Sequence, residues 1–523
     1  MPMLKITGRI YTGLLKPATT ECVLVGDDGR IAATGEEATR AAGKGIEELA
    51  LGSRVACPGF VDAHAHLDGL AKELTQLALG ETRSLDELLA RVAEASAKLD
   101  PARALFGSGW DESTWPAHEL PTRERLDRVA PGRAVVLRRV CGHLWAVNSK
   151  ALERIAARTD LTPKLRERLR AVSADGLLRE DDVALARPLA ELSPEDHREG
   201  LRRAMRHALA LGVTAVHDVG DVGDALREME RAETLPIRVV AGFSTSALVG
   251  QTFLSVQAAG SGDRQECLSY CSRVHPGPVK MFLDGSIGAQ TAAISFDFGD
   301  DPGNRGTLLF ETRDLIEELK PHADAGRDIA LHAIGDRAIA QALDAFERLA
   351  AERGDSPPNG TKGTVPFFRG RRRIEHLEII TPALVARMAP LGVIASMQPN
   401  FVGRWQRPGG LYEQRFGWER ARGLNPFRSI LRAGIPLAFG SDCMPMGPIF
   451  GIRSATTHPL ESERLTFVEA LHAYTLAAAR AGGIDRLTGS MEPGKDADIV
   501  LLSADGADAK VSEVFVGGRR IAR

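Results

Sequence analysis

The chain has 523 residues, more than one compact core holds, so we expect a barrel-sized domain with a smaller one. Its 44% hydrophobic and 26% charged residues are typical of a soluble globular protein. A net charge of −3, with both signs spread along the chain, argues against nucleic acid or a membrane as partner. The first residues lack a signal peptide's apolar core, and six cysteines without a Cys-x-x-Cys pair are typical of reduced thiols, so we expect a cytoplasmic location.

Both ends of the chain contain short strand patterns separated by turns. The candidates are residues 4–8, 20–25, 30–35, 498–502 and 511–521, with a hairpin signal at Asp27-Asp28-Gly29. Each end is short for an independent domain. We therefore predict that residues 1–56 and 490–523 together form one small composite β-sandwich.

Between the ends, residues 57–489 alternate strand and helix patterns, which is typical of βα units around a parallel sheet. The eight predicted strands are residues 60–67, 213–219, 237–243, 279–284, 329–334, 373–378, 393–398 and 436–441. Glycines such as Gly392 precede several of them and suit a left-handed helix C-cap. The pattern predicts an α/β fold, a (β/α)8 TIM barrel with its active site at the C-terminal strand ends.

Two segments depart from this regular alternation. The gap after the first strand is too long for one helix, so we predict an insertion at about residues 70–205 that builds much of the substrate pocket. Residues 354–364 are rich in Pro, Gly and Asn and read as an exposed loop. The basic run at residues 369–373 is interpreted as solvated surface rather than a nucleic-acid site.

Residues 57–68 contain two histidines, His64 and His66, separated by one residue at the end of the first barrel strand. Side chains alternate along a strand, so both imidazoles leave the same face of the backbone. Alternating histidines also occur on ordinary half-exposed strands. The preceding Pro-Gly turn and the apolar Phe60-Val61 favour a pair of metal ligands instead.

Side chains on four other predicted strands indicate the same chemistry. Lys280, His332 and His376 lie in the fourth, fifth and sixth strands, and Asp442 follows the eighth. A single histidine in an apolar strand is more often a core residue, but four histidines and an aspartate at the strand ends of one barrel form a metal site by ligand type. Lys280 is costly in an apolar strand unless its charge is paired, for example with Asp284. The alternative is N-carboxylation, which converts the ammonium group into a carbamate anion that would bridge two divalent cations.

These residues carry a family resemblance. Residues 58–66, Lys280, His332, His376 and Gly440-Ser441-Asp442 resemble the metal-dependent amidohydrolase superfamily, and the two ends with residues 489–498 look like its composite β-sandwich. More narrowly, the chain is similar to the YtcJ-like branch, relatives of N-substituted formamide deformylase, in residues 108–111, 120–123, 141–152 and 279–288. The resemblance covers nearly the whole chain and implies no particular substrate.

The resemblance implies which site residues hold each metal ion. His64, His66 and Asp442 would hold one divalent metal, expected to be zinc, and His332 and His376 a second, with N-carboxylated Lys280 bridging the two. The resemblance to this branch also implies that Trp110, His143 and Asp284 are candidates for contact with the substrate. His217 is a further candidate because it lies at the end of the second strand. The candidates for orienting the ligand imidazoles are Asp62, Asp68 and Asp336.

We predict a hydrolase of carbon–nitrogen bonds other than peptide bonds, acting on an amide-type small molecule such as an N-substituted formamide or a cyclic amide. A metal-activated hydroxide would attack the carbonyl carbon, and Asp442 would be the general base. Cys443 has no activating base assigned to it and is expected to be a packing residue. A homo-oligomer is compatible with the sequence.

Two alternatives stay open. The first is a deaminase of a heterocyclic ring with one metal, in which Lys280 would have no role and a glutamate is expected where this chain has Gly335. The second is a barrel without catalytic activity, although every ligand type is present.

Overall fold

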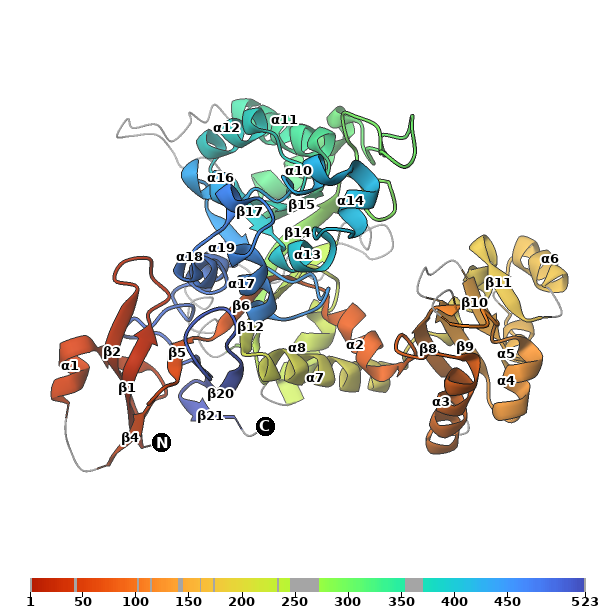
Figure 1. The fold of residues 1–523 in the computed structure, drawn as a ribbon, viewed down its shortest axis with the longest axis horizontal. Helices are drawn as coiled ribbons and strands as arrows, with labels where there is room; N and C mark the ends of the chain where they lie inside the picture. The colour runs from red at the N-terminus through yellow and green to blue at the C-terminus, as the bar shows by residue number, and fades with distance from the viewer. Residues whose placement is uncertain are drawn as a thin grey trace. The chain divides into compact units, whose positions relative to one another are not determined.

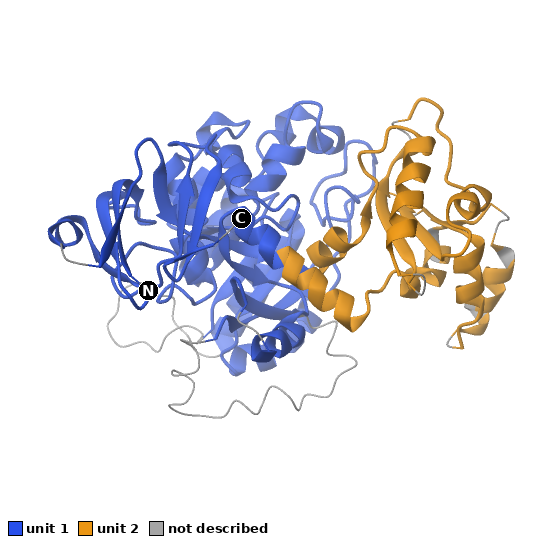
Figure 2. Cartoon of the chain, turned by 90° about the horizontal axis from the view of Figure 1, so that it is seen from below, with its two compact units in different colours: residues 1–67, 205–523 blue, residues 68–204 orange. Residues whose placement is uncertain are grey.

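The structure of the protein is a computed structural model that describes residues 2–41, 45–100, 103–112, 115–139, 144–159, 161–172, 175–232, 235–244, 272–352 and 370–521. The chain divides into two compact units, which Figure 2 shows in different colours. Unit 1 comprises Met1–Leu67 with Met205–Arg523, and unit 2 comprises Asp68–Ala204. Among the described residues, no helix is both long and apolar enough to cross a bilayer.

The centre of unit 1 is an eight-stranded sheet in which every neighbouring pair is parallel (Figure 1). Its strands, in chain order, are β6 (Phe60–Ala65), β12 (Val213–Asp218), β13 (Arg238–Ser244), β14 (Val274–Phe282), β15 (Ile329–Ala333), β16 (Arg372–His376), β17 (Ile394–Met397) and β18 (Leu437–Phe439). Sheet neighbours follow chain order from β6 to β18, as in successive βα units. The predicted (β/α)8 barrel is confirmed.

Helices alternate with these strands or follow the last of them. They are α8 (Gly223–Ala232), α10 (Thr312–Asp324), α11 (Asp336–Glu352), α12 (Pro382–Leu391), α13 (Pro399–Trp405), α14 (Leu411–Phe416), α15 (Trp418–Ala421), α16 (Phe427–Arg432), α17 (Pro448–Thr456), η5 (Glu461–Glu463), α18 (Phe467–Ala473) and α19 (Leu476–Ala481). Gly392 caps α12 with φ 60°, the left-handed conformation that turns the chain into β17.

The sheet closes between its first and last strands. The Asp442 backbone N–H, just after β18, donates a 2.7 Å hydrogen bond to the His64 carbonyl oxygen on β6. A Cβ atom on Gly440 would lie 2.3 Å from the His64 backbone nitrogen, so only glycine allows the strands to approach this closely. The closure therefore places Asp442 beside the two histidines that end the first strand.

Strands from the two ends of the chain form one sheet in unit 1 with the order β21-β20-β19-β5-β1-β2-β3, and β4 pairs with β1. Its elements are β1 (Met3–Tyr11), β2 (Thr19–Val25), β3 (Ile31–Thr34), α1 (Gly35–Arg40), β4 (Ile46–Ala50), β5 (Val55–Pro58), β19 (Ile499–Leu502), β20 (Val511–Val516) and β21 (Arg519–Arg520). The antiparallel β5–β19 pair joins the two ends. Its core mixes side chains from both termini, including Ile10, Val23, Ile499 and Phe515.

Unit 2 is built around a five-stranded sheet with the order β11-β10-β9-β8-β7. Its elements are α2 (Leu67–Thr75), β7 (Leu77–Ala78), α3 (Leu85–Lys98), β8 (Leu105–Trp110), α4 (Arg123–Val129), β9 (Val135–Arg139), β10 (Leu144–Val147), α5 (Ser149–Ala156), α6 (Pro163–Ala171), β11 (Leu177–Arg179), η2 (Glu180–Leu185), η3 (Arg187–Leu189) and α7 (Pro194–Ala210), which runs on into unit 1. Two hydrophobic clusters, one containing Leu88 and Trp110 and the other Trp145 and Ile155, give this unit a core of its own.

Candidate metal centre

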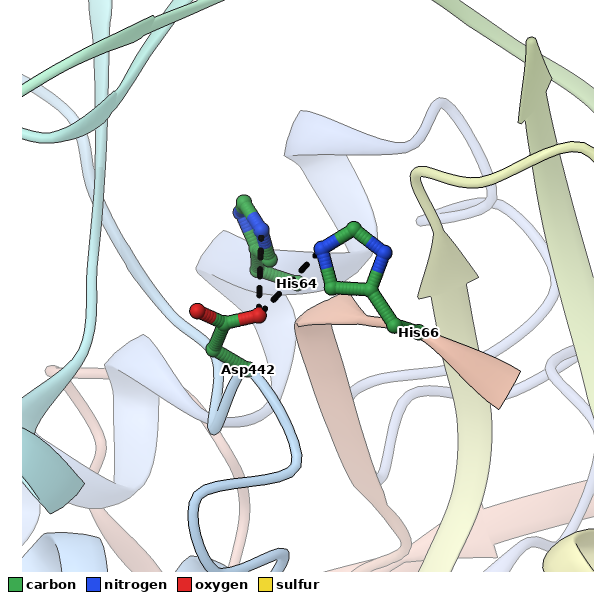
Figure 3. Close-up of side chains that lie close together, drawn as sticks. All are labelled: His64, His66 and Asp442. Carbon is green, nitrogen blue, oxygen red and sulfur yellow. Dashed lines mark ion pairs between the residues drawn. The ribbon is translucent and has the colours of Figure 1, made fainter. Parts of the chain in front are cut away.

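The ends of β6 and β18 bring three of the predicted ligands together (Figure 3). One ligand atom from each of His64, His66 and Asp442 lies within 4.8 Å of the others. The Asp442 Oδ1 atom is 3.6 Å from His64 Nε2 and 3.3 Å from His66 Nε2. Two imidazole nitrogens and a carboxylate oxygen at this spacing can coordinate one divalent cation.

The remaining three predicted ligands continue around the barrel from this group. The ring centroid of His376 lies 4.8 Å from that of His64 and 4.4 Å from that of His332. Lys280 is fully buried on β14, beside the β15 strand that carries His332. All six side chains therefore project from the C-terminal parts of five barrel strands.

Five of these six side chains carry a buried polar atom that has no hydrogen-bond partner among the described residues: His64 Nε2, Lys280 Nζ, His332 Nδ1, His376 Nδ1 and Asp442 Oδ1. Burying a polar group without a partner costs about 1–3 kcal/mol, so five such atoms gathered in one cluster need an explanation. A divalent metal supplies it, because imidazole nitrogens and carboxylate oxygens are its ordinary ligands. The six clustered side chains therefore fit the divalent metal that the sequence predicts.

Hydrogen bonds select the tautomers of two imidazoles. The Nδ1–H of His64 donates to Glu375 Oε2 at 2.7 Å, and the Nε2–H of His332 donates to the Gly285 carbonyl at 2.9 Å. The ring nitrogen left unprotonated in each case is the buried atom without a partner. Each ring therefore presents a lone pair, as metal coordination requires.

The backbone is strained at two of the ligand-bearing strand ends. His376 at the end of β16, Leu377 directly after it, and Asp442 and Cys443 after β18 all have φ between 53° and 76°. Residues other than glycine adopt this left-handed conformation at a cost of about 1–3 kcal/mol each, and such residues cluster at functional sites. His376 and Asp442, which carry this conformation, both lie beside His64.

The electrostatic environment keeps the imidazoles neutral. Burial, followed by repulsion from Lys280, lowers the pKa of His332 to about 3 and that of His64 well below its ordinary value. Burial acts in the opposite direction on the carboxyl group and raises the pKa of Asp442 to about 7. Neutral imidazoles keep the lone pairs that metal coordination requires.

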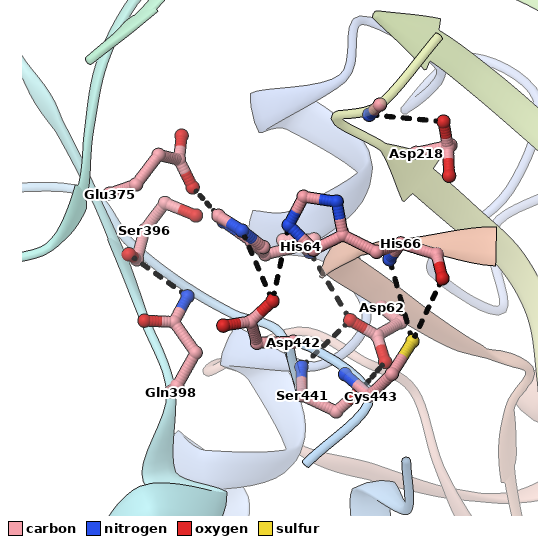
Figure 4. A network of polar contacts seen from close by, with 12 residues as sticks. Asp62, His64, His66, Asp218, Glu375, Ser396, Gln398, Ser441, Asp442 and Cys443 are labelled. Carbon is pink, nitrogen blue, oxygen red and sulfur yellow. Dashed lines mark hydrogen bonds and ion pairs between the residues drawn. The ribbon is translucent and has the colours of Figure 1, made fainter. Parts of the chain in front are cut away.

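Sequence reasoning missed Glu375 and chose other carboxylates to orient the ligand rings. Asp62 instead accepts hydrogen bonds from the backbone N–H groups of His64 and Ser441, joining β6 to the β18 end (Figure 4). Asp68 pairs with Lys72 and His197, and Asp336 accepts from the Ser295 N–H and hydroxyl groups. The signal that could have identified Glu375 is the charged Arg373-Ile374-Glu375-His376 run inside a predicted buried strand.

The structure describes three of the four residues predicted to contact the substrate. Trp110 is fully buried in a core cluster of unit 2. His217 is fully buried, with Nδ1 2.9 Å from Arg373 Nη1 and Nε2 directed at Gly482. The Asp284 carboxylate accepts the backbone N–H groups of Ala293, Ile334 and Gly335, which fixes the loop after β14 rather than leaving it open to a ligand. The fourth, His143, lies outside the described residues, as does most of the 354–370 loop.

Cys443 has the packing role expected of it. Its Sγ atom lies 3.4 Å from the His66 backbone nitrogen. Burial, with the nearby Asp62 carboxylate, raises the pKa of this thiol well above its ordinary value. A thiol held protonated is a poor nucleophile.

A (β/α)8 barrel with this cluster at its C-terminal strand ends defines a metal-dependent hydrolase. The chain matches the Amidohydrolase family over residues 47–522 and belongs to that family. It is 31% identical to Protein LONG AFTER FAR-RED 3 of Arabidopsis thaliana, with 94% of this chain and 87% of that one covered.

Two further relatives and one solved structure support this assignment. The chain is 30% identical to YtcJ of Bacillus subtilis (95% and 93% covered) and 28% identical to the N-substituted formamide deformylase of Arthrobacter pascens (97% and 94% covered). A crystal structure of an uncharacterized metal-dependent hydrolase from Pyrococcus horikoshii superposes with a TM-score of 0.76 at 27% identity, covering 97% of this chain and 99% of that one.

Proposed function

We propose that this hydrolase cleaves the carbon–nitrogen bond of a small amide, an N-substituted formamide or a cyclic amide, at a zinc centre held by the six clustered side chains. The observation that carries the proposal is the set of five buried polar atoms without partners on those side chains. His64, His66 and Asp442 would hold one ion, and His332 and His376 a second. A bound divalent metal lowers the pKa of water and polarises the carbonyl oxygen of the substrate.

Asp442 is the general base in this proposal. Its Oδ1 atom faces His64 and His66, and the second oxygen of the same carboxylate would take the proton of the attacking water. The carboxyl then returns the proton to the leaving nitrogen.

Lys280 is proposed to carry an N-carboxyl group. Its Nζ atom is buried, makes no hydrogen bond to the described residues, and does not pair with Asp284, whose oxygens are taken by backbone N–H groups. Burial lowers the pKa of Lys280 to about 8, which leaves a fraction of the amine neutral and able to attack carbon dioxide with loss of a proton. The carbamate oxygens would then bridge the two ions.

An apolar side chain beside the centre supports an amide with an apolar substituent. Phe282 ends β14, and its ring lies 4.9 Å from the ring of His332. It is 39% exposed, one of four exposed large hydrophobic side chains among the described residues. We propose that this ring contacts the substituent of the substrate, and the name of the Arthrobacter relative is consistent with that class.

A heterocycle deaminase is less compatible with the structure. A Cβ atom on Gly335 would lie 2.0 Å from the Ala293 carbonyl oxygen, so the glutamate expected of that reaction has no space here. Lys280 would also have no role.

The cysteines that the structure describes, Cys22, Cys57 and Cys443, are free thiols. We propose that the enzyme is cytoplasmic and acts on a small molecule. A homo-oligomer is compatible with this proposal.

The test is reconstitution of the metal-free chain with zinc and bicarbonate, followed by hydrolysis assays on formamides, N-acyl amines and cyclic amides. We expect two equivalents of zinc and activity on at least one of these classes. Zinc binding without hydrolysis of any amide would refute the substrate class. A chain that binds no divalent metal would refute the metal centre itself.

A further inference from the structure

An ion pair buried on β16 contacts the metal centre from within the barrel. Arg373 and Glu375 are both fully buried, and the guanidinium binds the carboxylate through two contacts, Nε to Oε1 at 2.8 Å and Nη2 to Oε2 at 3.1 Å. The same Oε2 atom accepts the Nδ1–H of His64 at 2.7 Å (Figure 4). We propose that Arg373 and Glu375 are positioning residues that set the orientation, tautomer and metal affinity of His64.

The hydrogen bonds of Arg373 define where Glu375 sits. Nη1 lies 2.9 Å from His217 Nδ1, and Nη2 also donates to the Ala63 carbonyl at 2.6 Å and to Ser396 Oγ at 3.0 Å. These contacts tie the guanidinium to β6, β12 and β17 as well as to β16. The planar donor fork of arginine can make these contacts together, whereas lysine could not.

The carboxylate in turn determines what His64 can do. A carboxylate accepts only, so the proton of His64 is held on Nδ1 and the lone pair of Nε2 faces Asp442. A carboxylate on the outer nitrogen of a ligating imidazole also makes that ring a better donor to a metal. Arg373 compensates the negative charge, so the pair strengthens His64 without adding net charge to the centre.

A purely structural role explains this arrangement less well. Buried ion pairs add little stability compared with apolar side chains of similar volume, because desolvation offsets their attraction. Another buried carboxylate, Glu463, shows what a structural role looks like: it accepts the N–H and hydroxyl groups of Ser429 at 2.9 and 2.6 Å. Glu375 instead gives one of its oxygens to a predicted metal ligand.

The experiment measures zinc affinity, by competition with a chromogenic chelator, and thermal unfolding of the metal-free chain. The variants are Glu375→Gln, the double variant Arg373→Met with Glu375→Leu, and Glu463→Gln as the matched control. In parallel, NMR of ¹⁵N-histidine-labelled parent protein reports which ring nitrogen of His64 carries the proton. The inference rests on the proposed metal centre, so the parent is titrated first.

We expect Glu375→Gln and the double variant to bind zinc roughly 10–100-fold more weakly than the parent. The double variant should remain folded, and Glu463→Gln should keep the parent's zinc affinity. Parental zinc affinity in a folded double variant would overturn the inference, as would a proton on Nε2 of His64 in the metal-free parent. Unfolding of both Glu375 variants would also overturn it, by making the role structural. No zinc binding by the parent would instead refute the proposed function.

Discussion

Gly440 is the residue whose substitution tests the closure of the barrel most sharply. In Gly440→Ala the new methyl carbon would lie 2.3 Å from the His64 nitrogen, 2.7 Å from its Cβ and 2.9 Å from its Cα. The first contact is more than 1 Å shorter than the roughly 3.5 Å optimum between heavy atoms. Because two of these atoms are backbone, the clash cannot be relieved by a change of rotamer.

The strands β6 and β18 must therefore separate locally. Overpacking of this kind costs about 1–3 kcal/mol, and losing the bond from the Asp442 N–H to the His64 carbonyl adds about 1 kcal/mol. The expected loss is about 2–4 kcal/mol in the free energy of unfolding. The same movement pulls His64 away from Asp442, so zinc affinity should fall at least ~10-fold.

Urea unfolding and zinc competition measure the two effects. Gly423→Ala is the control, because a Cβ there meets only the Arg420 carbonyl oxygen at 3.6 Å, an ordinary contact. A free energy of unfolding for Gly440→Ala within about 0.5 kcal/mol of the parent's (roughly the scatter of neutral surface substitutions), together with equal zinc affinity, would show that the strands tolerate a side chain here.

Four further predictions address the chemistry and its surroundings. Asp442→Asn should keep the fold and lower kcat by roughly 10²–10⁴-fold, and near-normal turnover would remove Asp442 as the base. Lys280→Met should leave the metal-free chain at least as stable and reduce bound zinc from two equivalents to one by mass spectrometry, whereas two retained equivalents would exclude a bridging role. Burial, with Arg238 nearby, lowers the pKa of His275 to about 4. The unfolded chain thus binds more protons between pH 6.5 and 4, so stability is lost as pH falls through that window. Relative to His275→Gln, the parent should lose about 2 kcal/mol between pH 7 and pH 5 in urea titrations, and parallel pH profiles would contradict this. Phe282→Ala should raise KM for amides with an aryl substituent about 10-fold more than KM for formamide itself, and an equal effect on both would argue against contact between this ring and the substrate.

Hydrophobic patterning was sufficient to predict the barrel, since all eight predicted strands are present in the structure. The largest boundary error is in β14, which begins at Val274 rather than Val279. The segment His275-Pro276-Gly277-Pro278 has the composition of a turn, yet Pro276 pairs with Ala241 of β13. Sheet pairing thus overrides local propensity at this position.

The side-chain partners inside the barrel were harder to predict than the ligands. His64, His66 and Asp442 follow from strand alternation and the order of the strands, which fix which residues reach the same rim. Strand alternation and strand order alone do not distinguish Glu375 from Asp62 as the partner of the His64 imidazole. Several carboxylates share that end of the sheet, and the length and direction of each side chain decide which one contacts the ring. Trp110 was predicted to contact the substrate because it belongs to a family motif, but its side chain packs into the core of unit 2.

The most direct test of the metal centre is anomalous diffraction at the zinc edge from crystals of the zinc-loaded protein. We expect one peak about 2.0–2.2 Å from His64 Nε2, a nitrogen of His66 and an oxygen of Asp442, and a second peak beside His332 and His376. Diffraction with no peak at these residues, or with zinc held elsewhere on the chain, would contradict this expectation.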